Sequence, residues 1–400
     1  MDVAVVGGGI VGLASAYYLA ERGADATVYE KGSLGSGSTE RSVGGIRTQF
    51  STPVNVDLSL ASMDVWESFE AEFDTDIAYR RPGYLFAARE ETTARAFEEQ
   101  VAMQNDRGVP SVLLDPEEAT DHCPGLRAEA FVAATYSPTD GFADPHLALQ
   151  GFAAAAREAG AEILTKTGVT EIHRERSGTR SDDAVTGVTA GGERWDVDFV
   201  VNAAGPWARR VAAMADIEIP VAPKRRQIVV VDPETPVPED VPLTVDLDTG
   251  SHFRPEREGA ALVGGHFDTG DEAGTAAGSE ADDPEQDPDG FDRKIDLDWA
   301  AEAVERAGDC ATYFGPDSEI RRGWAGLYAV TPDHHPIIEE TVPGFVQAVG
   351  FSGHGFQHAP ATGRIVAELV LDGEASLVDV SPLGSDRFES GDLIEERNVA

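Results

Sequence analysis

The sequence predicts an α/β fold, with α+β character overall, in which a Rossmann-like nucleotide-binding domain is interleaved with a second domain. The first 30 residues follow the order strand, tight turn, helix and strand, which is how a parallel sheet opens. Residues 199–203 form another apolar strand. Residues 227–231 and 260–263 resemble strands of an antiparallel sheet, so we expect a mixed or antiparallel sheet in the second domain.

The remaining elements follow from apolar spacing and from the residues that end helices. In the first helix, Val11, Ala14 and Leu19 recur at helical spacing, and Gly23 stands where the helix should end. The same reasoning predicts further helices at 94–107, 147–159 and 361–371, and strands at 3–6, 26–29, 82–88 and 346–349.

Length and composition restrict the class of protein. The chain has 400 residues, of which 41% are hydrophobic, so it can bury a sizeable core in more than one domain. It contains no run of about 18 apolar residues and no signal-peptide pattern, so we expect no membrane insertion. Its two cysteines, Cys123 and Cys310, indicate neither a disulfide framework nor a zinc ribbon, and a reducing cytoplasm fits them.

The charge is extreme for a chain of this size. The formal net charge is -41, from 72 acidic and 31 basic residues, which disfavours nucleic acid and anionic membranes as partners. We interpret this charge as that of a halophilic protein from a high-salt cytoplasm, where screening removes the self-repulsion. Residues 268–289 are expected to form an acidic surface insertion, and residues 386–400 a polar, peripheral tail.

A glycine-rich motif follows the first strand. Residues 7–12 (GGGIVG) match GxGxxG, in which Gly7 permits the tight turn, Gly9 lets the backbone approach a pyrophosphate and Gly12 lets the helix pack on the strand. Glu30 ends the second strand, where a carboxylate accepts hydrogen bonds from ribose hydroxyls. This context favours a dinucleotide site over a glycine turn without a ligand.

The segment after Glu30 favours FAD over NAD. Residues 35–50 are rich in Gly and Ser and contain Arg41 and Arg47, so many backbone N–H groups can lie along a flavin. A second GxGxxG motif is absent from the sequence, so a separate nicotinamide-binding domain is not expected.

Four parts of the chain carry a resemblance to a known family. They are the N-terminal motif, residues 37–51 (GSTERSVGGIRTQFS), residues 200–208 (VVNAAGPWA), and residues 324–338 with 350–364. In this order they resemble the D-amino-acid oxidase superfamily of flavoproteins. The likeness is nearest the branch of sarcosine oxidases, dimethylglycine dehydrogenases and the flavin subunit of proline dehydrogenase.

The resemblance implies a set of FAD-binding residues from all four parts of the chain. Residues 41–46 should line the pyrophosphate and the flavin ring, and residues 353–357 should surround the N1–C2 edge of the flavin. The full set of expected cofactor-binding residues is Gly7, Gly9, Ile10, Val11, Gly12, Glu30, Lys31, Ser38, Thr39, Arg41, Ser42, Gly45, Ile46, Val169, Ala204, Gly205, Trp207, Gly326, Gly353, His354, Gly355, Phe356 and Gln357.

The resemblance also implies substrate-binding residues. Arg47 matches an arginine that holds the substrate carboxylate in monomeric sarcosine oxidase, since a guanidinium pairs bidentately with a carboxylate. The alternative is an arginine at the surface or on the flavin phosphates. His266 matches a histidine near that enzyme's substrate, although a structural histidine is an equally good interpretation. Tyr84 and His354 are weaker candidates.

Other histidines are not assigned to the site. His334 and His335 are interpreted as part of an exposed loop. The pair His354 and His358 lies in the glycine-rich turn and not on a clear helix, so no metal site is expected.

The chain departs from this family at four places. Gly326 replaces a cysteine that tethers the flavin in monomeric sarcosine oxidases, and residues 39–47 lack the tethering histidine of dimethylglycine dehydrogenases, so non-covalent FAD is expected. Gln357 replaces a lysine that helps to hold the carboxylate in sarcosine oxidase, which argues against sarcosine itself. Leu262 replaces that enzyme's oxygen-activating lysine, which favours a dehydrogenase over an oxidase.

The expected protein has an FAD-binding domain from residues 1–80, 141–220 and 320–385, and a substrate domain from residues 81–140 and 221–319. The expected reaction is hydride transfer from the α-carbon of a small amino acid or N-alkyl amino acid to flavin N5, with an unknown electron acceptor. The alternatives are an FAD-linked 2-hydroxy acid or glycerol-phosphate dehydrogenase, and a flavoprotein subunit or assembly factor with little turnover of its own. A partner subunit or a homo-oligomer is compatible with the sequence.

Overall fold

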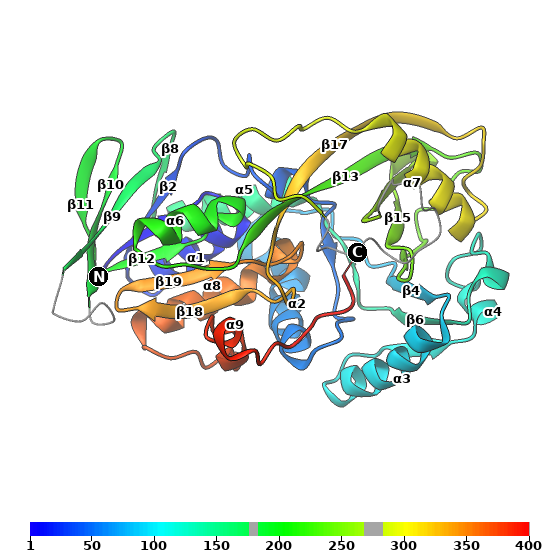
Figure 1. Ribbon diagram of the computed structural model, residues 1–400, viewed down its shortest axis with the longest axis horizontal. Coiled ribbons are helices and arrows are strands. Elements are labelled where there is room, and N and C mark those ends of the chain that lie inside the picture. The colour runs from blue at the N-terminus through cyan, green and yellow to red at the C-terminus, as the bar shows by residue number, and fades with distance from the viewer. Residues whose placement is uncertain (176–182, 268–282, 400) are drawn as a thin grey trace.

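The computed structural model describes residues 1–175, 183–267 and 283–399. The chain forms two regions beside each other, and it crosses between them several times (Figure 1). Each region has its own large sheet, which fits the expected interleaved α/β fold.

The first region is built on a six-stranded sheet with the order β18-β19-β12-β1-β2-β8. Five strands are parallel, and the edge strand β18 is antiparallel to β19. Their bounds are β1 (Asp2–Val6), β2 (Asp25–Glu30), β8 (Glu162–Thr165), β12 (Phe199–Asn202), β18 (Ile337–Val342) and β19 (Phe345–Val349).

Alternate side chains of β1 enter two separate cores. Val3 and Val5 pack with the helices α1 (Ile10–Glu21), α5 (Pro145–Glu158) and α8 (Gly355–Leu371). Ala4 and Val6 belong to the core on the other face, with α6 (Ala208–Met214) and the meander β9 (Val169–Glu175), β10 (Ala184–Ala190) and β11 (Glu193–Asp196). This alternation explains why the strand reads as an unbroken apolar run, since both faces of a parallel sheet are covered.

The second region has an eight-stranded sheet with the order β17-β13-β16-β15-β14-β4-β6-β5. Only β14 and β4 pair in parallel, so the sheet is mixed, as expected. One face packs against α7 (Leu297–Cys310). The strands are β4 (Tyr84–Ala88), β5 (Val112–Leu114), β6 (Ala133–Ser137), β13 (Ala222–Asp232), β14 (Leu243–Asp246), β15 (Ser251–Pro255), β16 (Ala261–Gly265) and β17 (Glu319–Val330).

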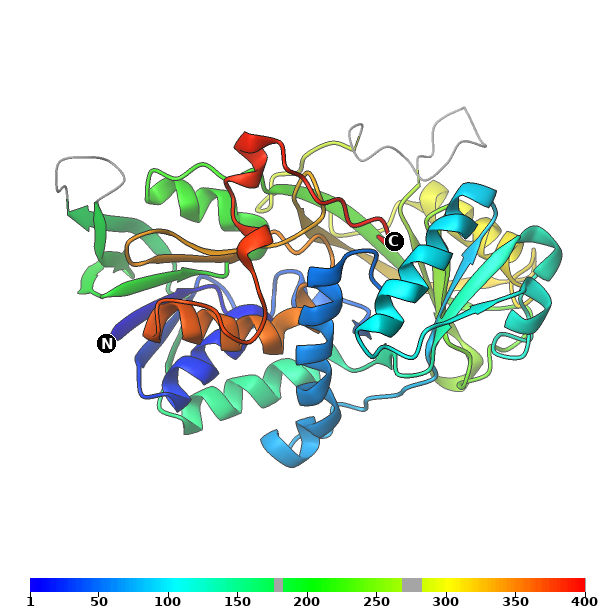
Figure 2. The same cartoon turned by 90° about the horizontal axis from the view of Figure 1, so that it is seen from below.

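Short elements and two long helices complete the fold. The helix α2 (Pro53–Phe73) packs on α8, and Figure 2 shows α3 (Glu91–Asp106) beside the second sheet. The small elements are β3 (Gly45–Ile46), β7 (Gly141–Phe142), α4 (Pro116–Ala119), α9 (Arg387–Ser390) and the 3₁₀ turns Thr39–Arg41, Ala128–Ala130, Gly205–Trp207, Arg257–Gly259 and Ser381–Leu383. Within the described part of the chain, none of the helices combines the length and the apolar character that a membrane span needs.

Two expected boundaries differ from the structure. Residues 320–385 are expected in the FAD-binding domain, and β17 falls at the start of this range. In the structure β17 instead pairs along its length with β13 in the second sheet. The helix predicted at 361–371 begins earlier, at Gly355, and contains Pro360. Pro360 is near the start of the helix, where a proline removes few intrahelical hydrogen bonds, so the helix continues on the N-terminal side of Pro360 as far as Gly355.

Three segments expected at the surface are held by specific contacts. In the tail, Glu396 and Asn398 are 1% and 2% exposed, so these two residues of the expected peripheral segment are buried, whereas residues 389–395 are exposed. His335 is also buried, with its Nε2 2.9 Å from Thr52 Oγ1, so it is not part of an exposed loop. Residues 268–282 of the expected acidic insertion lie outside the described residues, whereas 283–289 make ion pairs with basic residues of the first region and of β13. Charge pairing explains the last difference, because composition alone does not show where an acidic segment finds cations.

Candidate functional site

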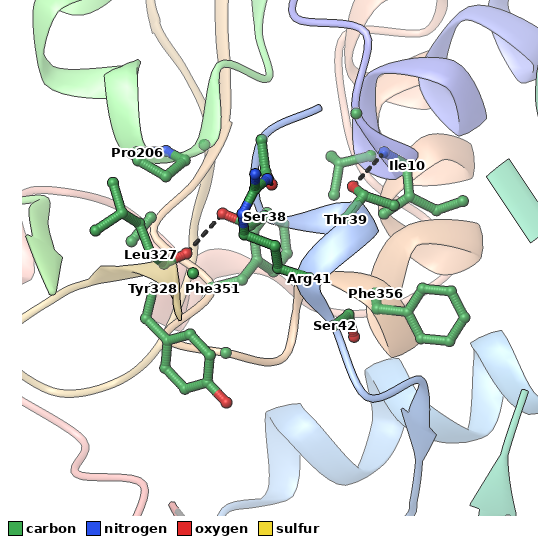
Figure 3. Close-up of a pocket in the computed structure, with 18 of the residues that line it drawn as sticks. Ile10, Ser38, Thr39, Arg41, Ser42, Pro206, Leu327, Tyr328, Phe351 and Phe356 are labelled. Atoms are coloured by element: carbon green, nitrogen blue, oxygen red, sulfur yellow. Dashed lines mark hydrogen bonds between the residues drawn. The ribbon is translucent and has the colours of Figure 1, made fainter. Parts of the chain in front are cut away.

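A cavity of about 700 Å³ lies between the two sheets. Its first wall contains residues that follow the carboxyl ends of β1, β2, β12 and β19, and its second wall comes from the eight-stranded sheet. The carboxyl edge of a parallel sheet is where nucleotide ligands bind in folds of this kind. Figure 3 shows side chains from several of these segments around the cavity.

The glycine-rich turn shapes one end of the cavity. Gly7 has a φ of 115°, which L side chains rarely adopt, and a Cβ on Gly12 would lie 2.0 Å from the carbonyl oxygen of Gly7. A Cβ on Gly9 would instead meet only Thr39 Oγ1, at 3.4 Å, so Gly9 faces open space. Gly9 therefore leaves room for a ligand, and Gly12 lets α1 pack against the turn.

The N-terminus of α1 points toward the cavity. The N–H of Ile10 donates to Thr39 Oγ1 at 3.2 Å, a contact drawn as a dashed line in Figure 3. The unpaired N–H groups of a helix start and its dipole favour an anion such as a pyrophosphate.

Glu30 stands at the end of β2 and lines the cavity. Its carboxylate accepts hydrogen bonds from the N–H groups of Gly8 at 2.8 Å and Gly32 at 2.6 Å. These contacts fix the carboxylate beside the glycine turn, where a ribose hydroxyl of a dinucleotide can donate to it.

The segment after β2 folds along the cavity. Arg41 donates through Nη1 to the carbonyl oxygens of Ser36 and Gly37, both at 2.7 Å. Ser38 donates to the carbonyl oxygen of Leu327 at 2.6 Å, which joins this segment to β17 (Figure 3). A Cβ on Gly326 would lie 3.0 Å from the Arg41 side chain, so a larger residue here would require Arg41 to shift by a few tenths of an ångström.

Lys31 and Trp207 lie at the outer part of the cavity end that contains the glycine-rich turn. The Lys31 ammonium lies 3.8 Å from the centre of the Trp207 ring and 2.5 Å from Asp289 Oδ1. Asp289 also accepts from Trp207 Nε1 at 2.9 Å and pairs with Arg210 at 2.6 Å. The hydrogen bond from Lys31 is the largest cause that lowers the pKa of Asp289 to about 2.

The opposite end contains the turn that leads into α8. Gly353 has a φ of 93°, and His354 is the residue before the first turn of α8. Gly353, His354, Gly355, Phe356 and Gln357 all line the cavity. The start of a 17-residue helix thus faces this end, which suits a partial negative charge.

Arg47 is buried where the two walls meet. It lines the cavity and is 6% exposed, and its guanidinium lies 3.9 Å from the centre of the Phe50 ring. The guanidinium donates to the carbonyl oxygens of Gln49 and Asn398, and Nη2 is 3.1 Å from His354 Nε2. Burial lowers the pKa of Arg47 and, together with the Arg47 charge, lowers that of His354 well below its usual range.

A row of side chains across the second sheet lines the cavity, and at one end of the row the Phe86 ring lies 5.2 Å from the Arg47 guanidinium. In register, Phe86 pairs with Val245, Val245 with His252, and Ile228 with Trp324, and all five side chains line the cavity. Tyr84 also lines it, and burial raises its pKa. The residues of this row are apolar apart from His252, and the same sheet also contributes the polar side chains of Tyr84, Arg226, Gln227 and Tyr328 to the cavity lining.

Most of the residues expected at the site lie on this one cavity. Of the expected cofactor-binding residues, Gly12 and Ile46 are not among those that line it, and Gly12 acts through packing instead. Arg47, Tyr84 and His354 line it, whereas His266 follows the end of β16 and does not. Leu262 does not line it; its side chain packs against Ile228 and Trp324 on the same face of the sheet.

The comparisons with known proteins agree with this geometry. Residues 2–369 match the family described as FAD dependent oxidoreductase (DAO). The chain is a DAO-family FAD-dependent oxidoreductase. Its fold class and its cofactor are therefore those expected from the sequence.

Relatives within the DAO family cover nearly the whole chain. A Xenopus laevis protein, "FAD-dependent oxidoreductase domain-containing protein 1", is 31% identical and covers 100% of this chain and 84% of its own length. Glycine oxidase of Geobacillus kaustophilus is 30% identical, over 96% of this chain and 97% of its own. The crystal structure of L-proline dehydrogenase from P. horikoshii has a TM-score of 0.85, with 33% identity, and covers 98% of this chain and 99% of that chain.

The cavity suits the FAD that the DAO family binds. The α1 N-terminus and the bare face of Gly9 can receive the pyrophosphate, and the fixed carboxylate of Glu30 can receive a ribose. The α8 N-terminus can stabilise negative charge on the flavin ring. Non-covalent attachment stays a prediction; both cysteines lie in the core between the second sheet and α7, away from the cavity-lining residues.

Sequence reasoning missed two buried groups at the substrate end. His252 lies across Gly264, whose Cβ would be 2.5 Å from Nε2, and burial lowers its pKa to about 4. Asp140 accepts from the Thr48 N–H at 2.9 Å and from Thr48 Oγ1 at 2.6 Å, and burial raises its pKa to about 6. A sequence signal for His252 was present. Successive side chains of a strand point to opposite faces, so a strand that buries Phe253 in the core directs His252 to the other face.

Proposed function

We propose that this DAO-family protein oxidises a small amino acid or N-alkyl amino acid, of the glycine, sarcosine or proline type, at its α-carbon. The observation that carries the proposal is the buried guanidinium of Arg47 on the cavity wall. Within the described part of the chain its hydrogen-bond partners are carbonyl oxygens and an imidazole, and no carboxylate forms an ion pair with it. A buried cation is costly unless an anion compensates it, and a substrate carboxylate supplies that anion.

The wall opposite Arg47 favours a compact substrate. Phe86, Val245 and Ile228 present apolar surface to the cavity, which excludes water and suits an aliphatic carbon skeleton. Relatives named glycine oxidase and L-proline dehydrogenase support a substrate of this size. His252 is the imidazole that we assign to this wall in place of His266.

Each group then has a task in the oxidation. Arg47 fixes the carboxylate, so the α-carbon is held at a constant distance from the ring-binding end of the cavity. FAD, when bound there, supplies the acceptor for the α-hydrogen with its electron pair. The substrate amine loses a proton, and a neutral imidazole such as that of His252 is able to take it, because its lowered pKa of about 4 leaves it unprotonated at pH 7. The resulting imine hydrolyses to the carbonyl product.

The electron acceptor is a separate part of the proposal. We propose a dehydrogenase, because Leu262 and its neighbours Ile228 and Trp324 place no cation at the position where an oxygen-activating lysine is found in sarcosine oxidase. A partner subunit is a further proposal, and the name "Sarcosine oxidase subunit beta" of one relative, 26% identical, supports it. A cytoplasmic location and adaptation to high salt are proposed from composition alone.

A reduction screen tests the proposed substrate class. The purified yellow protein is mixed without oxygen with glycine, sarcosine, dimethylglycine, L-proline, lactate and glycerol 3-phosphate, and the loss of flavin absorbance is recorded. Bleaching by one of the amino acids, and none by pyrrolidine, which lacks the carboxylate, is expected. Bleaching by lactate or glycerol phosphate in place of the amino acids would assign the protein to a different substrate class. No bleaching by any compound would favour a subunit or assembly role.

A further inference from the structure

The C-terminal segment 391–399 links the two regions of the molecule. From α9 it runs back toward α3 of the second region, as both views show (Figures 1 and 2). Its starting point is fixed by Arg387, which is 5% exposed and pairs with the buried Asp333 at 2.7 Å. Arg387 also donates to the carbonyl oxygen of His335 at 3.0 Å.

Glu396 anchors the segment a second time. Its side chain is buried and accepts from the Ser51 N–H at 2.8 Å, Ser51 Oγ at 2.7 Å, Thr52 Oγ1 at 2.9 Å and Asn55 Nδ2 at 3.0 Å. The Asn398 N–H donates to the same carboxylate at 3.1 Å. These are neutral donors, and hydrogen bonds to a charged group are among the strong ones in proteins.

Asn398 connects this anchored segment to Arg47 at the proposed substrate site. Its carbonyl oxygen accepts from Nη2 of Arg47, and its side-chain amide donates to Gln100 Oε1 of α3 at 3.0 Å. Asn398 is 2% exposed, and the segment contributes no residue to the cavity lining, whereas Arg47 does. The segment therefore contacts Arg47 from the side away from the cavity.

We propose that the segment 391–399 is a positioning element of the substrate site, which holds the Arg47 guanidinium at the cavity wall through an uncharged contact, the carbonyl oxygen of Asn398. The inference rests on the proposed role of Arg47 as the carboxylate anchor. A carbonyl oxygen restrains the guanidinium without forming an ion pair, so the guanidinium can still pair with a substrate carboxylate, although the charge of Glu396 acts on Arg47 through space. The carboxylate of Glu396 satisfies other donors and thus stays a fixed, indirect partner of the arginine.

The same contacts restrict the rotamers of Arg47 before substrate arrives. A free arginine side chain loses conformational entropy when it binds a ligand, and a side chain that is already fixed loses less. Removal of the segment should therefore weaken carboxylate binding through Arg47, while the binding of FAD, for which the α1 N-terminus and Glu30 supply sites that the segment does not contact, should change little.

The test uses the full-length holoprotein, a chain that ends at Gly391, and the substitutions Glu396→Ala and Glu395→Ala. Glu395 is the matched control, because its side chain is 62% exposed and its ion pair among the described residues is with the exposed Arg397. Acetate is titrated as a monocarboxylate probe, with the flavin absorbance spectrum as the readout for Kd. FAD content and Tm are measured for every variant, and trypsin cleavage after Arg397 reports release of the segment.

Glu396→Ala and the truncation should raise the Kd for acetate by about tenfold or more, the scale of a hydrogen bond to a charged group. Glu395→Ala should match the parent, and Glu396→Gln, which keeps an acceptor oxygen, should fall between. In an Arg47→Ala background the truncation should have no further effect, because the two changes act through one contact. An unchanged Kd in both the truncated chain and Glu396→Ala overturns the proposal, as does tighter binding, which would show that the segment competes for Arg47. If Arg47→Ala itself leaves the Kd unchanged, the proposed function fails first.

Discussion

The Arg47 guanidinium and the His354 imidazole lie against each other at the cavity, with Nη2 3.1 Å from Nε2, although 307 positions separate them in the chain. A cation at this distance requires the imidazole to be neutral and to accept the hydrogen bond. Burial and the charge of Arg47 both lower the pKa of His354, so the contact is consistent with a neutral histidine at pH 7. The start of α8 is thereby tied to the substrate side of the cavity.

This arrangement predicts a loss of stability in mild acid. Burial lowers the pKa of His252 to about 4, that of His358 to about 3, and that of His335 and His354 below 6.5. As the pH falls, these histidines are therefore protonated in the unfolded chain before they are protonated in the folded protein. Their contribution to the free energy of unfolding is complete above pH 6.5 and is lost as the pH falls toward 4. Tm measured by circular dichroism should fall between pH 7 and pH 4.5.

Asp140 opposes this trend but does not cancel it. Burial raises the pKa of Asp140 to about 6 and also raises that of Asp246, so the folded protein protonates these two carboxyls at a higher pH than the unfolded chain, against four histidines that act in the other direction. His358→Gln should make the dependence of Tm on pH shallower. A Tm that stays level or rises from pH 7 to 4.5 would contradict the assignment of neutral, buried histidines.

Arg47→Ala should weaken the use of any carboxylate substrate. Loss of one partner of a buried charged pair costs about 2–5 kcal/mol, and each 1.4 kcal/mol is tenfold in an equilibrium constant. We expect kcat/KM to fall by about 30-fold to several thousand-fold, mainly through KM, while FAD content is kept. Arg22→Ala, which breaks an exposed ion pair with Asp372 instead, is the control. Loss of flavin with normal kinetics in the remaining holoprotein would assign Arg47 to the cofactor.

Gly9 and Gly12 should respond differently to valine. Gly9→Val places a side chain in open space at the pyrophosphate end, so the protein should fold and lack FAD. Gly12→Val forces a Cβ to within 2.0 Å of the Gly7 carbonyl oxygen, so it should fold poorly. Absorbance at the flavin bands and Tm distinguish the two outcomes. Full FAD content in Gly9→Val would show that the cofactor does not approach this turn.

Salt should stabilise the protein if its charge reflects a high-salt environment. The formal net charge of -41 repels itself in dilute buffer, and the Debye length falls to about 3 Å at 1 M salt. Tm should rise between 50 mM and 2 M potassium chloride. Individual ion pairs such as Arg210 with Asp289 are weakened by the same salt, so the sign of the change decides which effect dominates. A constant or falling Tm would refute the high-salt interpretation.

Reoxidation by air should be slow compared with turnover by a dye. A cation beside the flavin stabilises superoxide as it forms, and at the position of the oxygen-activating lysine this chain has Leu262, which packs against Ile228 and Trp324 and brings no cation. Stopped-flow mixing of substrate-reduced protein with air-saturated buffer measures the rate. Leu262→Lys should increase it, and Leu262→Met, which keeps the apolar volume, should not. A wild-type rate in air that equals the rate with dyes would show that the protein is an oxidase.

The sequence by itself determined the cofactor end of the cavity. Gly7, Gly9 and Glu30 belong to one short βαβ unit, where local turn geometry and strand order set the position of each residue. Periodicity likewise found the strands around Phe199 and Phe345. Such features depend on neighbours close in the chain, so the amino-acid pattern alone is sufficient to place them.

Only the tertiary structure decided the substrate end. His252 reaches the cavity because β15 is paired between β14 and β16, while His266 lies just beyond the last strand residue. Asn398 contacts Arg47 because Glu396 accepts hydrogen bonds from a segment more than 340 positions earlier in the chain. Composition does not show this contact, since it indicates only a polar tail. The register between strands that are distant in the chain and the pairing of buried polar groups depend on the tertiary packing, and no local sequence pattern encodes them.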